Sequence, residues 1–204
     1  MPALKRRPAA PSARALSTLL TDVRACRLCA KHLPLGPRPV VQVDRAARIL
    51  IAGQAPGRRV HASGVPFDDP SGDRLRDWLG LDRDTFYDAR TVAILPMGFC
   101  YPGTGSNGDL PPRPECVPAW RERLLAQLPN VELTLVLGQY AQDYHLGGEH
   151  PSVTEAVIAW RDQWPAVLPL PHPSPRNQRW FKANPWFAVE VLPALRRRVK
   201  HLLG

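Results

Sequence analysis

Short runs of apolar residues alternate along the chain with segments in which apolar residues recur at helical spacing. The runs cover residues 49–52, 91–95, 133–137 and 166–168, and they predict four buried strands. Helical spacing predicts helices over 17–25, 71–79, 120–128, 139–145 and about 185–203, with Ser71 or Asp73 as the N-cap of the second. Strands that alternate with helices are typical of a parallel sheet covered by helices. We therefore expect an α/β fold, a three-layer sandwich whose central, mostly parallel four-stranded sheet is flanked by helices.

The first predicted strand stops abruptly at Gly53-Gln54-Ala55-Pro56-Gly57, which we call the glycine turn. Few side chains cover the backbone of such a turn, so its N–H groups can approach a ligand closely. Ligands of open α/β sheets bind at the carboxyl ends of the strands. Two further Gly/Pro-rich loops follow predicted strands, at 96–118 and at 171–177, and three prolines stiffen the second. Taken alone, the glycine turn is too common a motif to distinguish a binding site from an ordinary turn.

The four cysteines form a tight pair, Cys26 and Cys29, and a wider pair, Cys100 and Cys116. A Cys-x-x-Cys turn lets two thiolates meet one metal ion or cluster, and a long loop can supply the other two. We expect a structural metal site at these residues, because disulfides are disfavoured in a cytoplasmic protein. Zn²⁺ and a [4Fe–4S] cluster both accept four thiolates, and the spacing does not separate them. Buried, inert thiols are the remaining alternative.

The formal net charge of +9 is unevenly distributed. Residues 1–48 and 172–204 are strongly basic, whereas the middle of the chain is acidic. Basic ends that converge on one face would favour a polyanion such as nucleic acid. We expect a disordered basic tail over 1–14, followed by one domain over 15–204. No apolar stretch is long enough for a signal peptide or a membrane span, so we expect a cytoplasmic, monomeric protein without membrane contact.

The order of these motifs resembles the uracil-DNA glycosylase superfamily, and most closely its iron–sulfur branch, family four. The glycine turn resembles the G-E-A-P-G motif of that family, and Gly64-Val65-Pro66-Phe67 resembles its G-x-P-F. Cys100 and Cys116 follow at the family's spacing, and His172-Pro173-Ser174 takes the place of its histidine-bearing second motif. The segment 172–177, HPSPRN, also resembles the second motif of single-strand-selective monofunctional uracil glycosylases. The resemblance covers roughly residues 17–200.

The resemblance implies a monofunctional DNA glycosylase of base excision repair that binds a [4Fe–4S] cluster. Such an enzyme flips the damaged nucleotide out of the helix and hydrolyses its N-glycosidic bond. His172 would donate a hydrogen bond to the departing uracil or other deaminated base, helped by backbone N–H groups of the glycine turn. Phe67 would stack on the base, and Gly53, Ala55, Pro56 and Gly57 would complete the substrate pocket. Ser174, Pro175, Arg176, Asn177, Arg179 and Lys182 would contact single- or double-stranded DNA.

Several positions depart from the family pattern. Gln54 stands where family four has Glu, and Pro96 stands where it has the Asn that recognises uracil. The residue that orients the attacking water is therefore open: Gln54 could hold it, and His61, Asp68 or Asp69 could act as the base. Asp68 and Asp69 could equally cap the helix that follows. The remaining histidines, His32, His145, His150 and His201, carry no motif and are expected at the surface.

These departures keep a second function open. A relative of the superfamily that binds DNA and senses lesions without cleaving them would also fit the sequence. A third possibility, a protein that traps DNA covalently through a histidine before its last cysteine, is disfavoured because residues 101–115 contain no histidine.

Overall fold

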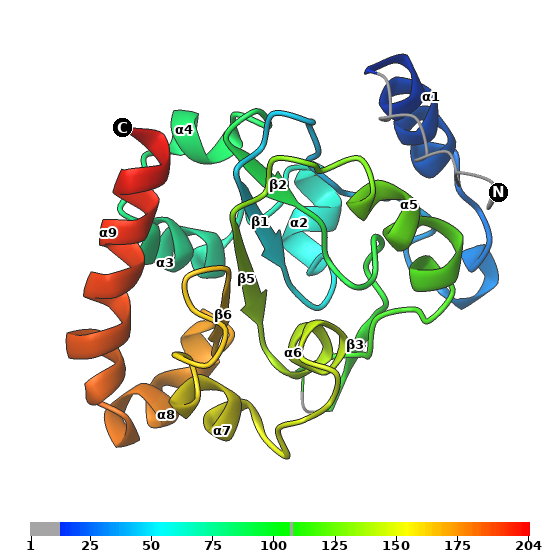
Figure 1. Cartoon of the computed structure of the whole chain (residues 1–204). Helices are drawn as coiled ribbons and strands as arrows, with labels where there is room; N and C mark the ends of the chain where they lie inside the picture. The colour runs from blue at the N-terminus through cyan, green and yellow to red at the C-terminus, as the bar shows by residue number, and fades with distance from the viewer. Residues whose placement is uncertain (1–12, 107) are drawn as a thin grey trace, which may run out of the picture.

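The computed structural model describes residues 13–106 and 108–204. Its central sheet has four parallel strands in the order β2-β1-β5-β6 (Figure 1). They are β1 (Ile49–Ala52), β2 (Val92–Ile94), β5 (Leu133–Leu137) and β6 (Val167–Leu170). The prediction of a parallel four-stranded sheet is confirmed. β6 includes Pro169, which a strand at the edge of the sheet tolerates because one side of its backbone needs no ladder partner.

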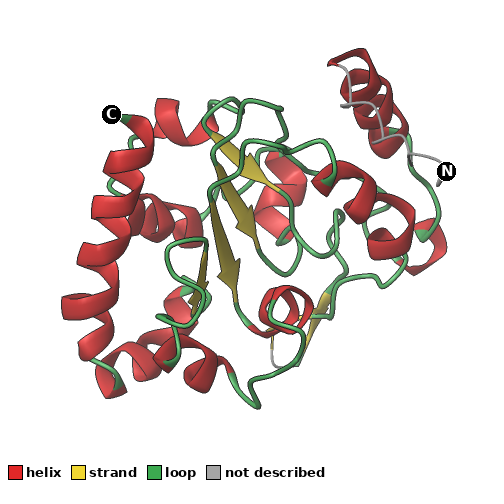
Figure 2. Ribbon diagram, in the orientation of Figure 1, coloured by secondary structure: helices red, strands yellow, loops and turns green. Residues whose placement is uncertain are grey.

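Helices surround this sheet (Figure 2). They are α1 (Ala13–Arg24), α2 (Arg58–Ser63), α3 (Pro70–Leu79), α4 (Arg83–Tyr87), α5 (Glu122–Leu125), α6 (Gln139–His145), α7 (Val153–Ile158), α8 (Gln178–Ala183) and α9 (Leu192–Leu203). Two 3₁₀ turns, η1 (Ala30–His32) and η3 (Pro175–Asn177), and two π-helical turns, η2 (Val117–Arg121) and η4 (Phe187–Val191), complete the set. The π-helical turns lead directly into α5 and α9. Within the described ranges, none of these helices has the length and apolarity that a membrane span requires.

The sheet separates two apolar layers, because successive side chains of a strand point to opposite faces. Ile49 and Ile51 of β1 pack in a cluster with residues of α3, η4 and α9. Leu50 packs on the other face with residues of α1 and α5, and Ala52 packs with α6. Figure 1 shows α3 and α9 on one side of the sheet and α1 and α5 on the other. The chain is thus the expected three-layer α/β sandwich.

Several boundaries differ from the sequence prediction. Residues 1–12 of the predicted tail lie outside the described residues, and α1 already includes Ala13 and Arg14. The N-cap of α3 is Asp69, not Ser71 or Asp73: its Oδ1 accepts a hydrogen bond from the Gly72 N–H at 2.9 Å. Pro70 then takes the first helical position, where a missing N–H costs nothing. No element is predicted where α2, α4, α7 and α8 lie, and the predicted loop 96–118 holds a small antiparallel hairpin of β3 (Thr104–Gly105) and β4 (Gly108–Asp109).

Candidate active site

A cavity of about 400 Å³ opens beside the glycine turn, where β1 and β6 end. This volume lies in the range of small-molecule pockets, ~300–1,000 Å³. It is lined by Val40, by the glycine turn with the start of α2, by the segment that leads into α3, by Ile94, Pro96 and the hairpin, and by the loop after β6. The lining side chains that carry candidate chemistry are Gln54, Phe67, Asp69, Asp109, His172 and Arg176. The structure therefore brings together motifs that are far apart in the sequence.

The glycine turn is fixed by its own backbone and by the side chain of Gln54. The carbonyls of Gly53 and Gln54 accept hydrogen bonds from the N–H groups of Met97 and Gly98, at 2.8 and 2.9 Å. The side-chain amide of Gln54 donates to the carbonyl of Leu110 at 2.9 Å. Gln54 thus ties the turn to the chain just beyond the hairpin. This places Gly53, Gln54, Ala55, Pro56 and Gly57 on one wall of the cavity.

Phe67 is held beside this wall in an unusual backbone conformation. Its φ of 54° makes it the one non-glycine residue with positive φ among the described residues. α3 approaches this residue closely, since a Cβ placed on Gly72 would lie 1.8 Å from the Phe67 carbonyl oxygen. Arg76 and Tyr87 donate hydrogen bonds to the same oxygen, at 3.4 and 3.3 Å. Strained residues of this kind persist only where their surroundings fix them, as happens at binding sites.

The ring of Phe67 lies against the glycine turn. Its Cζ is 3.7 Å from the position that a Cβ on Gly53 would take. The ring also packs edge-on against Phe86, with ring centroids 6.3 Å apart. A flat ligand in the cavity would therefore meet an aromatic ring that its neighbours hold in place.

His172 enters the cavity from the loop after β6. Its Nδ1 accepts a hydrogen bond from the Ser174 N–H at 3.2 Å, so the neutral ring carries its proton on Nε2. Burial lowers the pKa of His172, although Asp69 and Asp109 oppose that shift. Asn177 fixes the backbone by donating from Nδ2 to the His172 carbonyl at 2.7 Å. The site thus presents a neutral imidazole with a free N–H donor at neutral pH.

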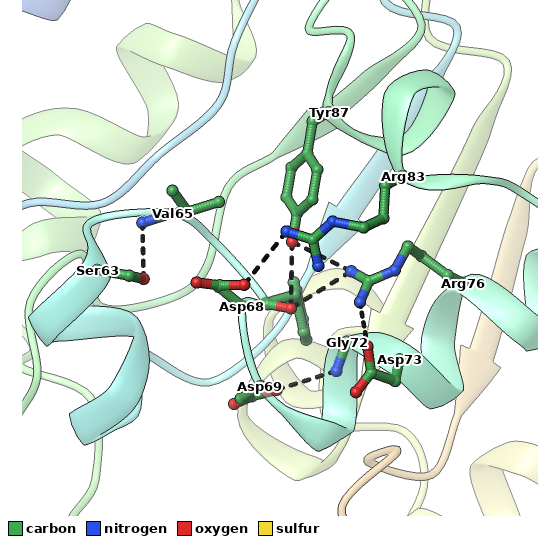
Figure 3. A network of polar contacts seen from close by, with 10 residues as sticks. Ser63, Val65, Asp68, Asp69, Gly72, Asp73, Arg76, Arg83 and Tyr87 are labelled. Carbon is green, nitrogen blue, oxygen red and sulfur yellow. Dashed lines mark hydrogen bonds and ion pairs between the residues drawn. The ribbon is translucent and has the colours of Figure 1, made fainter.

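The structure separates the four candidates for water activation. Gln54 and Asp69 line the cavity, whereas Asp68 and His61 do not. Asp68 instead pairs with Arg83 at 3.3 Å, as Figure 3 shows. His61 lies in α2 with its ring centroid 6.1 Å from that of Tyr101, and its buried Nδ1 has no hydrogen-bond partner among the described residues. Helical structure after Gly57 explains its position, because α2 places His61 beyond the residues that face the cavity.

Asp109 is a cavity carboxylate that the sequence analysis did not select. It lies on β4, and its Oδ1 accepts a hydrogen bond from the Thr104 hydroxyl at 2.9 Å. Its Oδ2 is 3.4 Å from the position of a Cβ on Gly57. Pairing of the hairpin strands brings it there, and no local sequence motif marks that pairing.

The predicted DNA-contacting residues divide into three groups. Ser174, Pro175 and Arg176 line the mouth of the cavity. Arg179 and Lys182 lie exposed on α8, outside the cavity lining. Asn177 is occupied in holding the His172 backbone. Trp180 and Trp186 pack against the main apolar cluster.

The four cysteines come from three separate segments and are free of disulfides. Burial is the main cause that raises the pKa of Cys100 to about 12 and that of Cys116 to about 11, and the charges of neighbouring cysteines contribute in the same direction. Cys29 packs with Cys100 in one small buried cluster. Over residues 13–106 and 108–204, no three His, Cys, Asp or Glu side chains converge as on a single metal ion.

N–H groups point at the cysteine sulfurs. The indole Nε1 of Trp120 donates to Cys26 Sγ at 3.2 Å. The backbone N–H groups of Arg38 and Phe99 donate to Cys100 and Cys116. Thiolate ligands in an apolar setting with N–H donors to sulfur are the environment of protein-bound iron–sulfur clusters. The residues present therefore fit such a cluster.

Behind the cavity a buried arginine contacts a partly buried histidine, and no sequence motif marks this pair. Arg121 is fully buried, and its Nη2 lies 2.7 Å from the Nε2 of His145. The prediction that His145 lies at the surface is wrong, because α6 turns it toward Arg121. Burial, and then the charge of Arg121, lower the pKa of His145 to about 4. The exposed positions of His32 and His201 agree with the prediction.

The sequence of the chain is similar to those of known proteins. A family model described as the uracil DNA glycosylase superfamily matches residues 40–196. A type-4 uracil-DNA glycosylase of Thermotoga maritima is 28% identical over 160 residues, covering 74% of this chain and 78% of the relative.

Proposed function

The chain belongs to the uracil-DNA glycosylase superfamily, and we propose that it is a monofunctional DNA glycosylase that removes uracil or another deaminated base from DNA. The observation that carries this proposal is the neutral His172, whose Nε2–H is directed by the Ser174 hydrogen bond and whose ring lies in the same cavity as the glycine turn and Phe67. The similarity to a type-4 enzyme supports the same reaction class.

The cavity residues can divide the chemistry between them. A base flipped from the stack would lie against the Phe67 ring, an apolar surface on which any base can stack. As the N-glycosidic bond breaks, negative charge collects on the base. The Nε2–H of His172 and the backbone N–H groups of the glycine turn would stabilise that charge, and one such donor is typically worth ~3–4 kcal/mol. A water molecule then attacks the sugar carbon and loses a proton.

We assign activation of this water to Asp69 in place of Asp68 or His61. The α3 cap uses Oδ1 of Asp69, and Oδ2 has no hydrogen-bond partner among the described residues. Asp69 also has the largest of the electrostatic effects that raise the pKa of His172, which agrees with a carboxylate close to the ring. Gln54 suits this role less, because its neutral side-chain amide, whose nitrogen donates to the Leu110 carbonyl, does not accept the proton that the water loses.

We further propose that Cys26, Cys29, Cys100 and Cys116 hold a [4Fe–4S] cluster, with structural zinc as the alternative. A bound cluster would supply structural cross-linking between three segments of the chain. The protein's own part is the apolar burial of the thiols and the N–H donors to their sulfurs. None of the catalytic steps above involves the cluster.

Excision assays test the proposed activity. Oligonucleotides with uracil, hypoxanthine or xanthine, single- and double-stranded, should yield abasic sites with the wild-type protein. His172→Ala should lower the single-turnover rate ~10²–10³-fold. His201→Ala, an exposed histidine on α9, should leave the rate unchanged. Absence of abasic product from every substrate would rule out the enzyme.

A lesion-sensing protein without activity is the second candidate. It is favoured by Pro96, which lines the cavity where the family's uracil-reading residue is expected. Tight binding to a damaged oligonucleotide without release of any base, by both the wild type and His172→Ala, would establish this alternative.

A further inference from the structure

Arg121 reaches the back of the base cavity from η2. Its Nη1 donates hydrogen bonds to the carbonyls of Leu95 and Pro96, at 2.5 and 2.7 Å. Its side chain is 0% exposed. Pro96 lines the cavity, so this buried cation lies directly behind part of the cavity wall.

The charge of Arg121 is compensated without any carboxylate. Among the described residues, Arg121 has no ion pair, and its Nε has no hydrogen-bond partner. The neutral ring of His145 lies 2.7 Å from Nη2, and the guanidinium carbon lies 5.0 Å from the centroid of the Tyr144 ring. Burial lowers the pKa of Arg121 to about 10, so the side chain stays charged at neutral pH. A buried charge without an opposite charge is costly, which favours a role beyond stability.

The backbone polar groups of Leu95 and Pro96, which lie in front of Arg121, all have partners. The Leu95 N–H donates to the Ile51 carbonyl of β1, and the Met97 N–H donates to Gly53. Pro96 has no N–H at all. Arg121 takes the remaining acceptors, the carbonyls of Leu95 and Pro96. A base in the cavity therefore meets the apolar ring of Pro96 here and neither a donor nor an acceptor.

We propose that Arg121 is a positioning residue that keeps this wall apolar, so that the wall near Pro96 selects a base by shape alone. Hydrogen-bond recognition of the base then falls to the opposite wall, the glycine turn and His172. The inference rests on the proposed function, because it treats the cavity as a base pocket. It makes Arg121 a determinant of base preference through two carbonyls, without contact to the base.

Lysine at position 121 would disturb this arrangement in a defined way. Its ammonium is a point charge on a flexible stem and lacks the planar fork that reaches two neighbouring carbonyls and His145 together. One carbonyl would then be free to turn toward the cavity. A free carbonyl acceptor would strengthen the binding of a base that has a donor at that edge, such as the amino group of cytosine. Uracil has nearly the same shape but lacks this amino group.

Binding of uncleavable nucleotides tests the inference separately from catalysis. The probes are oligonucleotides with 2′-fluoro-2′-deoxyuridine or 2′-fluoro-2′-deoxycytidine at one position. Arg121→Lys should change the ratio of the two dissociation constants about tenfold in favour of cytosine, which corresponds to one hydrogen bond. Arg198→Lys is the matched control: Arg198 also donates to a carbonyl, that of Glu132, and does not line the cavity. It should leave the ratio unchanged.

The outcomes separate this inference from the proposed activity. An unchanged ratio, or equal weakening of both probes, would overturn the role of Arg121. If Arg121→Lys does not fold, Pro96→Asn takes its place: an amide on an otherwise apolar wall should change the ratio at least tenfold relative to Pro96→Ala, and an unchanged ratio again overturns the inference. If the ratio of dissociation constants shifts while the wild type releases no base, the proposed glycosylase activity is wrong and the proposed role of Arg121 still holds.

Discussion

The base cavity and the cysteine site differ in what holds them together. The polar groups of the cavity find partners within the chain: Gln54 bonds Leu110, His172 bonds Ser174, and Asp69 bonds Gly72. For the cysteine thiols, in contrast, the chain does not stabilise the form that a metal site needs. Burial and mutual repulsion raise the pKa values of Cys100 and Cys116, so the chain by itself disfavours the thiolates that a metal requires.

This difference indicates that the protein's own contacts preorganise the cavity, whereas the cysteine site is organised by a bound metal ion or cluster. Metal binding to buried thiols releases their protons and contributes its free energy to folding. The two regions are also linked, because η2 begins directly after Cys116 and carries Arg121, which fixes the cavity wall at Pro96. Loss of the metal ion or cluster should therefore lower the stability of the fold strongly and disturb the cavity to a smaller extent.

Removal of one cysteine should have the largest effect. Cys100→Ser removes one of the four thiolates proposed to coordinate the metal ion or cluster. Coordination is the interaction that we propose offsets the cost of burying the thiols. We expect a loss of at least about 3 kcal/mol of stability, roughly a quarter of the binding free energy of a structural metal. Thermal unfolding and the iron and sulfide content per chain measure it. A brown wild-type protein with iron and sulfide supports the cluster, and stoichiometric zinc in a colourless protein would replace it.

Substitution of Gly72 should disturb the cavity from within the chain. A Cβ at this position lies 1.8 Å from the Phe67 carbonyl oxygen, so Gly72→Ala must displace either α3 or Phe67. Overpacking of this kind costs ~1–3 kcal/mol. Excision should fall more than tenfold, because the stacking surface moves. Gly147→Ala is the control for excision: nothing lies within 4 Å of its Cβ position, but its φ of 67° strains an alanine, so this variant should lose stability without losing excision. Normal excision by a stable Gly72→Ala protein would contradict the role given to Phe67.

The sequence predicted the parts of both regions that depend on local pattern. Apolar runs marked β1 and β5 with the bounds observed, because buried parallel strands are apolar on both faces. It missed α2 and α8, which are short and flanked by glycine, proline or asparagine. It also missed the cap of α3, since Asp69 precedes a proline that begins the helix.

Tertiary contacts explain the remaining differences at the site. Arginine is almost never fully buried, so nothing in the sequence singled out Arg121. Asp109 lies at the cavity because its strand pairs in the hairpin, and Asp68 lies away from it because it forms an ion pair with Arg83. The motif order predicted which loops meet, whereas the direction of each side chain depended on partners far away in the chain.

Acid should destabilise the fold through His145, which contacts Arg121 between the two regions. The folded protein protonates His145 only near pH 4, whereas the unfolded chain does so near pH ~6.5. The unfolded state thus binds more protons in this window, and stability falls as the pH falls through it. We expect a loss of about 1 kcal/mol between pH 6.5 and 5.5, to which His172 adds in the same direction. Denaturant unfolding of the wild type and His145→Gln measures it, and equal pH slopes for the two would contradict this account.

The mouth of the cavity should respond least to a single change. Arg176 lies exposed beside Gly108, with its Nη1 3.0 Å from the position of a Cβ on that glycine. An arginine that meets one phosphate adds about one unit to the slope of log affinity against log salt concentration. Arg176→Ala should weaken DNA binding severalfold at low salt and reduce the slope by about one unit. Arg197→Ala, an exposed arginine on α9 outside the cavity lining, is the control. Because the cavity itself is held by internal partners, base preference should not change. A shift in preference with an unchanged salt slope would instead place Arg176 against the base.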